Sequence, residues 1–332
     1  MEQEQSASHW WPTCGVMLGA LTVSMNNGVL NSVSWSMEET TMLQRQLGHL
    51  VLNRIVESEG ADFDPLAFFP ETPPEAWAPH KGWLQPRAMD PVSGNLIFPM
   101  QSYLVRTRHH TILVDTCVGD HKKRQRPNWN MTTSGKFLAD LASAGVRPDA
   151  VDYVLCTHLH VDHVGWNTQL RDGRWVPTFP NATHIFSRQE WDYWAAVHQA
   201  TPLEHMADSV LPIVEAGQAV FVANDYALND EVWLEPTPGH TPNHVSVHLA
   251  SNGAHAVITG DMMHSPVQCA EPMWVARPDF DRDLARATRR AFLERYCDAD
   301  VLICGTHFPS PSMGHIVPHG DAFRFQYEHG AD

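Results

Sequence analysis

The densest group of potential metal ligands in the sequence lies in the run THLHVDHVG, residues 157–165. His158 and His160 follow a strongly apolar stretch, and extended residues two positions apart point the same way, so both imidazoles could bind one metal ion. Asp162 and His163 come after the expected turn and would serve a neighbouring site. Burying these side chains without a metal ion would leave several polar groups unpaired, at a high cost in free energy. The run therefore predicts a metal centre.

Three separate segments end a strand-like stretch on a histidine or an aspartate. They are VDYVLCTH, HAVITGD and DVLICGTH, which end on His158, Asp261 and His307. Because residues at strand ends can converge on one edge of a sheet, we expect these side chains to meet.

An alternation of helical and strand-like segments predicts an α/β fold. Residues 134–146 carry apolar side chains at helical spacing, and residues 151–158 after them form the most strand-like run in the chain. The second half repeats this style, with a further helix expected at residues 283–296. Other expected elements are a strand at 48–59, a hairpin at 100–107 and 111–120, and a Pro-rich loop with packed aromatic side chains at 65–91.

Length and composition indicate one main domain. We expect it at residues 43–332, after an N-terminal extension at residues 1–42. A net charge of -16 argues against nucleic acid and anionic membrane surfaces as partners. The six cysteines form no CxxC pair, which favours free thiols in a reduced, cytoplasmic protein. Residues 10–30 lack both the basic start of a signal peptide and the unbroken apolar length of a membrane span.

The motif HxHxDH resembles the signature of the metallo-β-lactamase superfamily, and three later motifs follow in that family's order. These are TPGHTPNH with His240, ITGDMMH with Asp261 and CGTHFP with His307. The resemblance covers roughly residues 48–319. It implies a four-layer αβ/βα sandwich with a dinuclear metal site in a cleft at one edge.

Motif position also implies how the ligands divide between two divalent ions. The first ion would take His158, His160 and His240, the second would take Asp162, His163 and His307, and Asp261 would bridge them. Two divalent ions with two carboxylates and a bridging hydroxide would carry one net positive charge, which attracts electron-rich oxygen. Such ions would lower the pKa of the bridging water towards ~7. Zn²⁺ suits these ligands best, while Mn²⁺, Co²⁺ and Fe²⁺ also fit.

Two residues of this sequence differ from those typical of other branches of the superfamily, which reduces the number of branches that it could belong to. Leu159 stands where the iron-dependent oxidoreductases have a glutamate, and Asp261 stands where the best-known zinc β-lactamases have a cysteine. The phrases HVDHVGWN, PTPGHTPNHVSV and GDMMHSP look most similar to the branch of quorum-quenching lactonases and methyl parathion hydrolase. Those lactonases typically have a tyrosine where this chain has His264. The His264 side chain could itself donate a proton or hydrogen bond to the leaving oxygen, or it could be an exposed or supporting histidine.

Other residues near the motifs have less specific roles. Asp115 could orient a metal-bound imidazole or cap a turn. Large side chains next to the ligand motifs could form an aromatic pocket wall, although core packing would explain them equally: Trp166, Phe308, Met263 and Trp274.

The leading hypothesis is hydrolysis of a small-molecule lactone or carboxylic ester by a hydroxide that bridges two metal ions, with Asp162, Asp261 and His264 in catalytic roles. The alternatives are an aryl phosphotriester hydrolase, a thioesterase of the glyoxalase II type, a mononuclear iron dioxygenase and a metal-binding protein without turnover. The oligomeric state stays open, with a homodimer as one option.

Overall fold

The computed structural model describes residues 44–328, and residues 1–43 and 329–332 lie outside the described part. The extension expected at residues 1–42 therefore falls outside it. No helix among residues 44–328 is long and apolar enough to cross a membrane.

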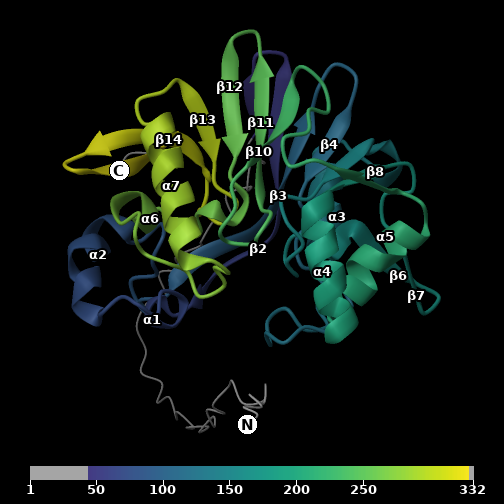
Figure 1. The fold of residues 1–332 in the computed structure, drawn as a ribbon, viewed down its shortest axis with the longest axis horizontal. Helices are drawn as coiled ribbons and strands as arrows, with labels where there is room; N and C mark the ends of the chain where they lie inside the picture. The colour runs from purple at the N-terminus through teal and green to yellow at the C-terminus, as the bar shows by residue number, and fades with distance from the viewer. Residues whose placement is uncertain (1–43, 329–332) are drawn as a thin grey trace, which may run out of the picture. The chain divides into compact units, whose positions relative to one another are not determined.

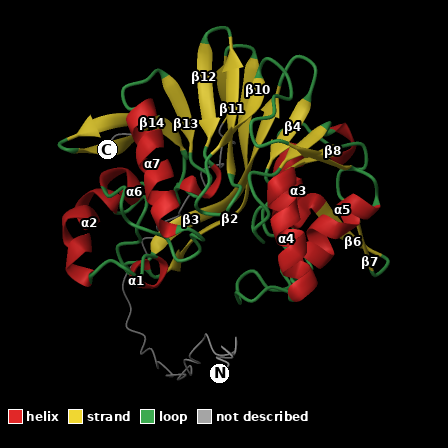
Figure 2. Cartoon of the chain, viewed as in Figure 1, coloured by secondary structure: helices red, strands yellow, loops and turns green. Residues whose placement is uncertain are grey.

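Two mixed β-sheets form the centre of the described part (Figure 1; Figure 2). The first has the order β1-β2-β3-β4-β5-β8-β9, antiparallel from β1 to β4 and parallel from β4 to β9. Its strands are β1 (Gln44–Leu47), β2 (Leu50–Phe63), β3 (Leu96–Arg106), β4 (Thr111–Val114), β5 (Tyr153–Leu155), β8 (Thr183–Ser187) and β9 (Ala219–Val222). The expected first strand and the expected hairpin are therefore confirmed.

The second sheet runs in chain order and is antiparallel except for the parallel pair β12 and β13. Its strands are β10 (Val232–Pro236), β11 (Val245–Ser251), β12 (Ala254–Ile258), β13 (Val301–Cys304), β14 (Met313–His319) and β15 (Ala322–Tyr327). A separate hairpin joins β6 (Thr168–Arg171) to β7 (Arg174–Pro177).

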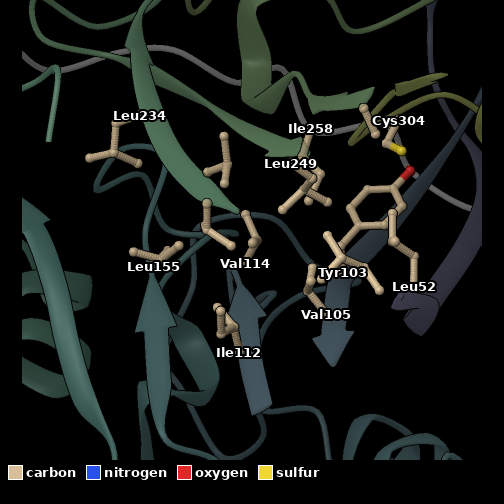
Figure 3. Packing of buried hydrophobic residues seen from close by; sticks show 14 of the residues in the cluster. Leu52, Tyr103, Val105, Ile112, Val114, Leu155, Leu234, Leu249, Ile258 and Cys304 are labelled. Atoms are coloured by element: carbon tan, nitrogen blue, oxygen red, sulfur yellow. The ribbon is translucent and has the colours of Figure 1, made fainter. Parts of the chain in front are cut away.

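Apolar side chains from both sheets fill the space between them (Figure 3). Leu52 and Val114 come from the first sheet, and Leu249 and Ile258 from the second. Full burial of each aliphatic side chain stabilises the fold by about 1.5–3 kcal/mol. The two sheets are held face to face by this core.

Helices cover the outer faces of the two sheets (Figure 1). Phe137 and Leu141 of α3 (Lys136–Ser143) are buried in one core cluster with strand residues of the first sheet. Phe292 and Leu293 of α7 (Arg282–Tyr296) are buried in another with residues of the second sheet. The expected α/β sandwich and the helices expected at 134–146 and 283–296 are confirmed.

The helical segments after residue 91 also include the longer α4 (Arg188–Ala200). The others are short: α5 (Leu211–Glu215), α6 (Val267–Ala270), the 3-10 turns η2 (Pro148–Ala150), η3 (Gly165–Asn167) and η5 (Gly260–Met262), and the π-helical turn η4 (Met206–Val210). The side chain of Ser187 caps α4 by accepting a hydrogen bond from the backbone N–H of Glu190.

The prediction of a loop at residues 65–91 is wrong in part. This stretch contains α1 (Pro65–Phe68), the 3-10 turn η1 (Pro74–Trp77) and α2 (Ala78–Leu84). Each of the three begins with a proline in its first two positions, where the missing N–H breaks no helical hydrogen bond. The expected packing of its aromatic side chains is confirmed, because Phe69 and Trp77 are buried.

Candidate metal centre

The potential ligands lie in loops that follow strands of both sheets. Residues 158–163 follow β5, His240 lies between β10 and β11, Asp261 follows β12 and His307 follows β13. Ligand atoms of His158, His160, His240 and Asp261 all lie within 4.8 Å of one another, and so do those of Asp162, His163 and His307. The structure therefore brings together all seven side chains expected from the motifs.

Asp261 is shared between the two groups. Its Oδ1 lies 3.1 Å from Nε2 of His163 and 3.1 Å from Nε2 of His307. Its Oδ2 lies 3.3 Å from Nε2 of His240 and 3.8 Å from Nε2 of His158. Each carboxylate oxygen thus faces a different group of imidazoles.

The other ligand atoms complete the same division. Nδ1 of His160 lies 2.9 Å from Nε2 of His240 in the first group. In the second group, the carboxylate of Asp162 lies 3.8 Å from Nε2 of His163 and 3.7 Å from Nε2 of His307. Two sets of nitrogen and oxygen atoms converge, and each set could hold a divalent cation.

Several of these atoms have no hydrogen-bond partner among residues 44–328. They are Nε2 of His158, Nε2 of His163 and Oδ1 of Asp261, and all three are buried. An unsatisfied buried polar atom costs on the order of 1–3 kcal/mol. Coordination to a cation would remove that cost, so the residues fit the metal ions that the sequence motifs imply.

A backbone turn places Asp261 at the junction. Gly260 has φ of 55°, and a Cβ atom there would lie 2.5 Å from Nε2 of His244. His244 Nε2 accepts a hydrogen bond of 2.9 Å from the backbone N–H of Asp261. Only glycine combines this conformation with so close an approach.

Asp115 orients His163. Its Oδ2 lies 3.0 Å from Nδ1 of His163, and its carboxylate also accepts hydrogen bonds from the backbone N–H and the hydroxyl of Thr157. Asp115 has φ of 61°, a left-handed conformation that costs on the order of 1–3 kcal/mol in a non-glycine residue. These contacts match the orienting role considered for Asp115, with His163 as the imidazole concerned.

Two further partners hold imidazoles. Nδ1 of His240 lies 2.9 Å from Oδ1 of Asp279, and Nδ1 of His307 donates to the carbonyl oxygen of Pro99 at 2.9 Å. Asp279 was not predicted from the sequence, because the surrounding segment RPDF carries no recognisable metal motif.

Burial and neighbouring charges act in opposite directions on these groups. Burial lowers the pKa of His158 and His160 well below the usual histidine value. Burial alone would also lower the pKa of His163, but the carboxylates of Asp261 and Asp115 outweigh it and raise that pKa. Burial would raise the pKa of Asp261, but its histidine neighbours hold it well below the usual value. An ionised carboxylate is the state that binds cations.

A cavity of about 370 Å³ opens onto the centre. His160, Asp162, His240, Asp261 and His307 line it together with a largely aromatic wall of Phe63, Phe68, Phe98, Met100 and Trp129. The wall therefore includes Phe68, which belongs to the stretch at residues 65–91.

The pocket-wall prediction is wrong for all four residues, because none of them lines this cavity. Trp166 is buried and stacks on Phe137 with ring centres 5.5 Å apart. Met263 and Phe308 belong to the core cluster beside α7. Trp274 packs on Trp77, with ring centres 4.7 Å apart. Adjacency to a ligand in sequence did not place these side chains on the same side of the chain as the ligand.

His264 lines the cavity, and the exposed alternative is excluded because the residue is buried. Its Nε2 lies 3.3 Å from Oδ2 of Asp261, and its ring meets Phe68 edge to face at 5.1 Å. Neither ring nitrogen has a hydrogen-bond partner among the described residues. Burial lowers the pKa of His264.

A family model described as the metallo-beta-lactamase superfamily matches residues 98–317, well over half of the chain. The chain belongs to this superfamily. Among curated members, an N-acyl homoserine lactonase of Bacillus thuringiensis is 28% identical over 174 residues, which cover 49% of this chain and 63% of the relative. The match thus spans less than two thirds of the relative's length.

Two solved structures share the fold of this chain. Hydrolase AbOPH of the beta lactamase superfamily aligns with a TM-score of 0.73 at 24% identity, covering 88% of this chain and 98% of that one. AidC, described as a dizinc quorum-quenching lactonase in complex with a product, aligns with a TM-score of 0.68 at 23% identity, with the same coverage of both chains. These alignments support the same sandwich architecture.

Proposed function

We propose that this metallo-beta-lactamase family member hydrolyses a lactone or carboxylic ester with two divalent metal ions. The observation that carries the proposal is the position of Asp261, whose two carboxylate oxygens face separate groups of imidazoles. A single carboxylate in this arrangement suits a bridge between two cations.

The proposed ligands are those named by the motifs. His158, His160 and His240 would hold one ion, Asp162, His163 and His307 would hold the other, and Asp261, whose oxygens face both groups, would bridge them. Asp115 and Asp279 orient their imidazoles. Zn²⁺ is the proposed metal, because five imidazoles and two carboxylates suit it, and Mn²⁺, Co²⁺ and Fe²⁺ are the other candidates. Bound divalent ions would lower the pKa of a shared water molecule and polarise the carbonyl oxygen of the substrate.

The side chains of the cavity supply binding and proton transfer. Its aromatic wall holds an apolar acyl or aryl group and excludes water from the reacting bond. Asp162 lines the cavity, so its carboxylate can accept a proton from the attacking water. His264 has no competing hydrogen-bond partner in the described part of the chain and donates its N–H to the leaving oxygen of the substrate.

The names of the relatives support a lactone as substrate. The relative from Bacillus thuringiensis is named N-acyl homoserine lactonase and matches about half of this chain at 28% identity. The apolar cavity agrees with a substrate that joins a polar ester group to a hydrophobic part.

Metal analysis combined with a substrate panel tests the proposal. We expect about two metal ions per chain, and turnover of at least one lactone or 4-nitrophenyl ester that chelation abolishes and added metal restores. Thioesters and aryl phosphotriesters belong in the same panel. Turnover confined to either class would replace the proposal with the corresponding alternative, and a fully metal-loaded protein inactive on all four classes would indicate metal binding without hydrolysis.

A further inference from the structure

Arg126 lies where two cavities meet. The cavity described above, called here the active-site cavity, shares four lining residues with a second cavity of about 430 Å³, called here the side cavity: Arg126, Trp129, His160 and Val161. The side cavity is also lined by Lys123 and Arg124, together with the carboxylate of Glu204. Cationic side chains therefore gather beside the metal centre in a chain whose net charge is -16.

The other cations of the side cavity are already paired. Lys123 lies 3.3 Å from a carboxylate oxygen of Glu204, and Arg124 lies 2.7 Å from one of Asp208. Arg126 forms no salt bridge with any residue in the described range 44–328, where Asp162 and Asp62 are the carboxylates that attract it, and its Nε is buried without a hydrogen-bond partner. The only hydrogen bond of its side chain within that range runs from Nη2 to the backbone carbonyl oxygen of Asp62, at 3.1 Å.

Aromatic rings hold the Arg126 guanidinium in place. The guanidinium carbon lies 4.0 Å from the centre of the Phe63 ring and 5.0 Å from that of Trp129, and both rings line the active-site cavity. Such stacking leaves the in-plane N–H groups free to donate, and a guanidinium held in advance loses less entropy on binding an oxygen anion.

A second guanidinium lines the same cavity. Arg277 donates from Nε to the carbonyl oxygen of Ala67 at 2.8 Å and forms no salt bridge within the described residues. Besides the proposed metal ligands, the cavity therefore combines a largely aromatic wall with two guanidinium groups that form no salt bridge among the described residues. This combination favours a ligand that is both apolar and negatively charged.

We propose that Arg126 binds an anionic group that the substrate carries in addition to its ester bond, so that the enzyme selects esters or lactones bearing a carboxylate or a similar anion. The inference rests on the proposed hydrolytic function and names the substrate class within it. The aromatic wall receives the apolar part of the substrate, and Arg126 receives the anion at the junction of the two cavities.

A matched pair of esters tests the selectivity. Mono-4-nitrophenyl adipate and 4-nitrophenyl hexanoate differ in the terminal carboxylate and have acyl chains of equal length. With metal-loaded wild-type protein, we expect kcat/KM to be about tenfold or more higher for the adipate ester, mainly through KM, as for one charge-assisted pair. Added salt should reduce this ratio.

Two substitutions and one control locate the effect. Arg126→Met keeps the bulk of the side chain and removes its charge, so the adipate-to-hexanoate ratio of kcat/KM should fall to about one. Arg126→Lys keeps the charge without the planar fork and should retain part of the ratio. Arg188→Met removes a guanidinium stacked at 4.2 Å on Phe221, outside both cavities, and should leave the wild-type ratio unchanged.

Binding measurements separate this inference from the proposed function. The 4-nitroanilides of the same two acids resist hydrolysis, and calorimetric titration of metal-loaded protein gives their affinities directly. If wild-type protein hydrolyses neither these two esters nor any lactone or ester of the panel, the proposed function fails. The inference is still supported in that case if wild-type protein binds the adipate anilide more tightly than the hexanoate anilide and Arg126→Met loses this difference. Equal affinity for both anilides, or a ratio retained in Arg126→Met, overturns it.

Discussion

The carboxylate of Asp279 lies 2.9 Å from Nδ1 of His240, although the two residues are 39 positions apart in the chain. Asp279 is itself held by the backbone N–H of Ala276 at 3.0 Å and by Arg289 at 3.4 Å. The imidazole of His240 is therefore fixed with Nε2 directed towards Asp261.

Asp279→Asn is expected to weaken metal binding. The amide carries no charge to strengthen the His240 hydrogen bond, so the affinity for metal should fall about 10- to 100-fold, as is usual for partners of metal-bound histidines. Competition with a chromogenic chelator measures this affinity. Asp283→Asn, at an exposed position near the start of α7, is the matched control, and equal affinities in the two variants would contradict the orienting role of Asp279.

Asp261→Asn is expected to disrupt both metal positions. Its two oxygens face separate groups of imidazoles, so the loss of charge should lower the metal content. The fall in kcat/KM should exceed the loss of about 10- to 100-fold that is usual when a partner of a metal-bound histidine is replaced. Elemental analysis with ester kinetics checks both effects. A variant that retained two ions per chain and wild-type turnover would exclude Asp261 as a bridge.

His264→Phe is expected to slow turnover without removing metal. Phenylalanine keeps the packing against Phe68 but cannot donate a hydrogen bond, so kcat should fall about 100-fold or more. His264→Tyr restores a donor and should recover part of the loss. Steady-state kinetics on a lactone, with metal content measured in parallel, separate this role from metal binding; wild-type kcat in His264→Phe would rule it out.

Lys122 is expected to make stability rise with pH. Burial lowers its pKa from the ordinary lysine value of 10.5 to about 7 in the folded protein. Between these pH values the unfolded chain holds a proton that the folded chain has released, so the free energy of unfolding increases as pH rises from about 7 towards 10.

Lys122→Met removes this contribution. Relative to the variant, wild-type protein should gain about 1–2 kcal/mol of unfolding free energy between pH 7 and pH 9. Urea unfolding at both pH values, with equal metal content in the two proteins, measures the difference. Parallel pH dependences in the two proteins would show that Lys122 titrates as in an unfolded chain.

Local patterns in the sequence predicted the proposed ligands and most of the elements. The run at residues 157–165 holds four of the proposed ligands within six residues, so their proximity follows largely from the short length of chain between them. The helices at α3 and α7 and the strands before the ligands were predicted by periodicity, which depends on which face of an element is buried. The turns and short helices of residues 65–91 were missed, because prolines are as typical of first helical turns as of loops.

The tertiary structure decided which distant residues complete the site. Asp279, the aromatic wall with Phe63 and Phe98, and the position of Arg126 between two cavities follow from the packing of segments that carry no shared motif. Trp166 and Phe308 lie in hydrophobic core clusters, although each is close to a proposed ligand in the sequence. Burial of their rings in these clusters stabilises the fold. The proposed ligands can be named from short motifs, whereas the side chains and charges that surround them depend on long-range packing.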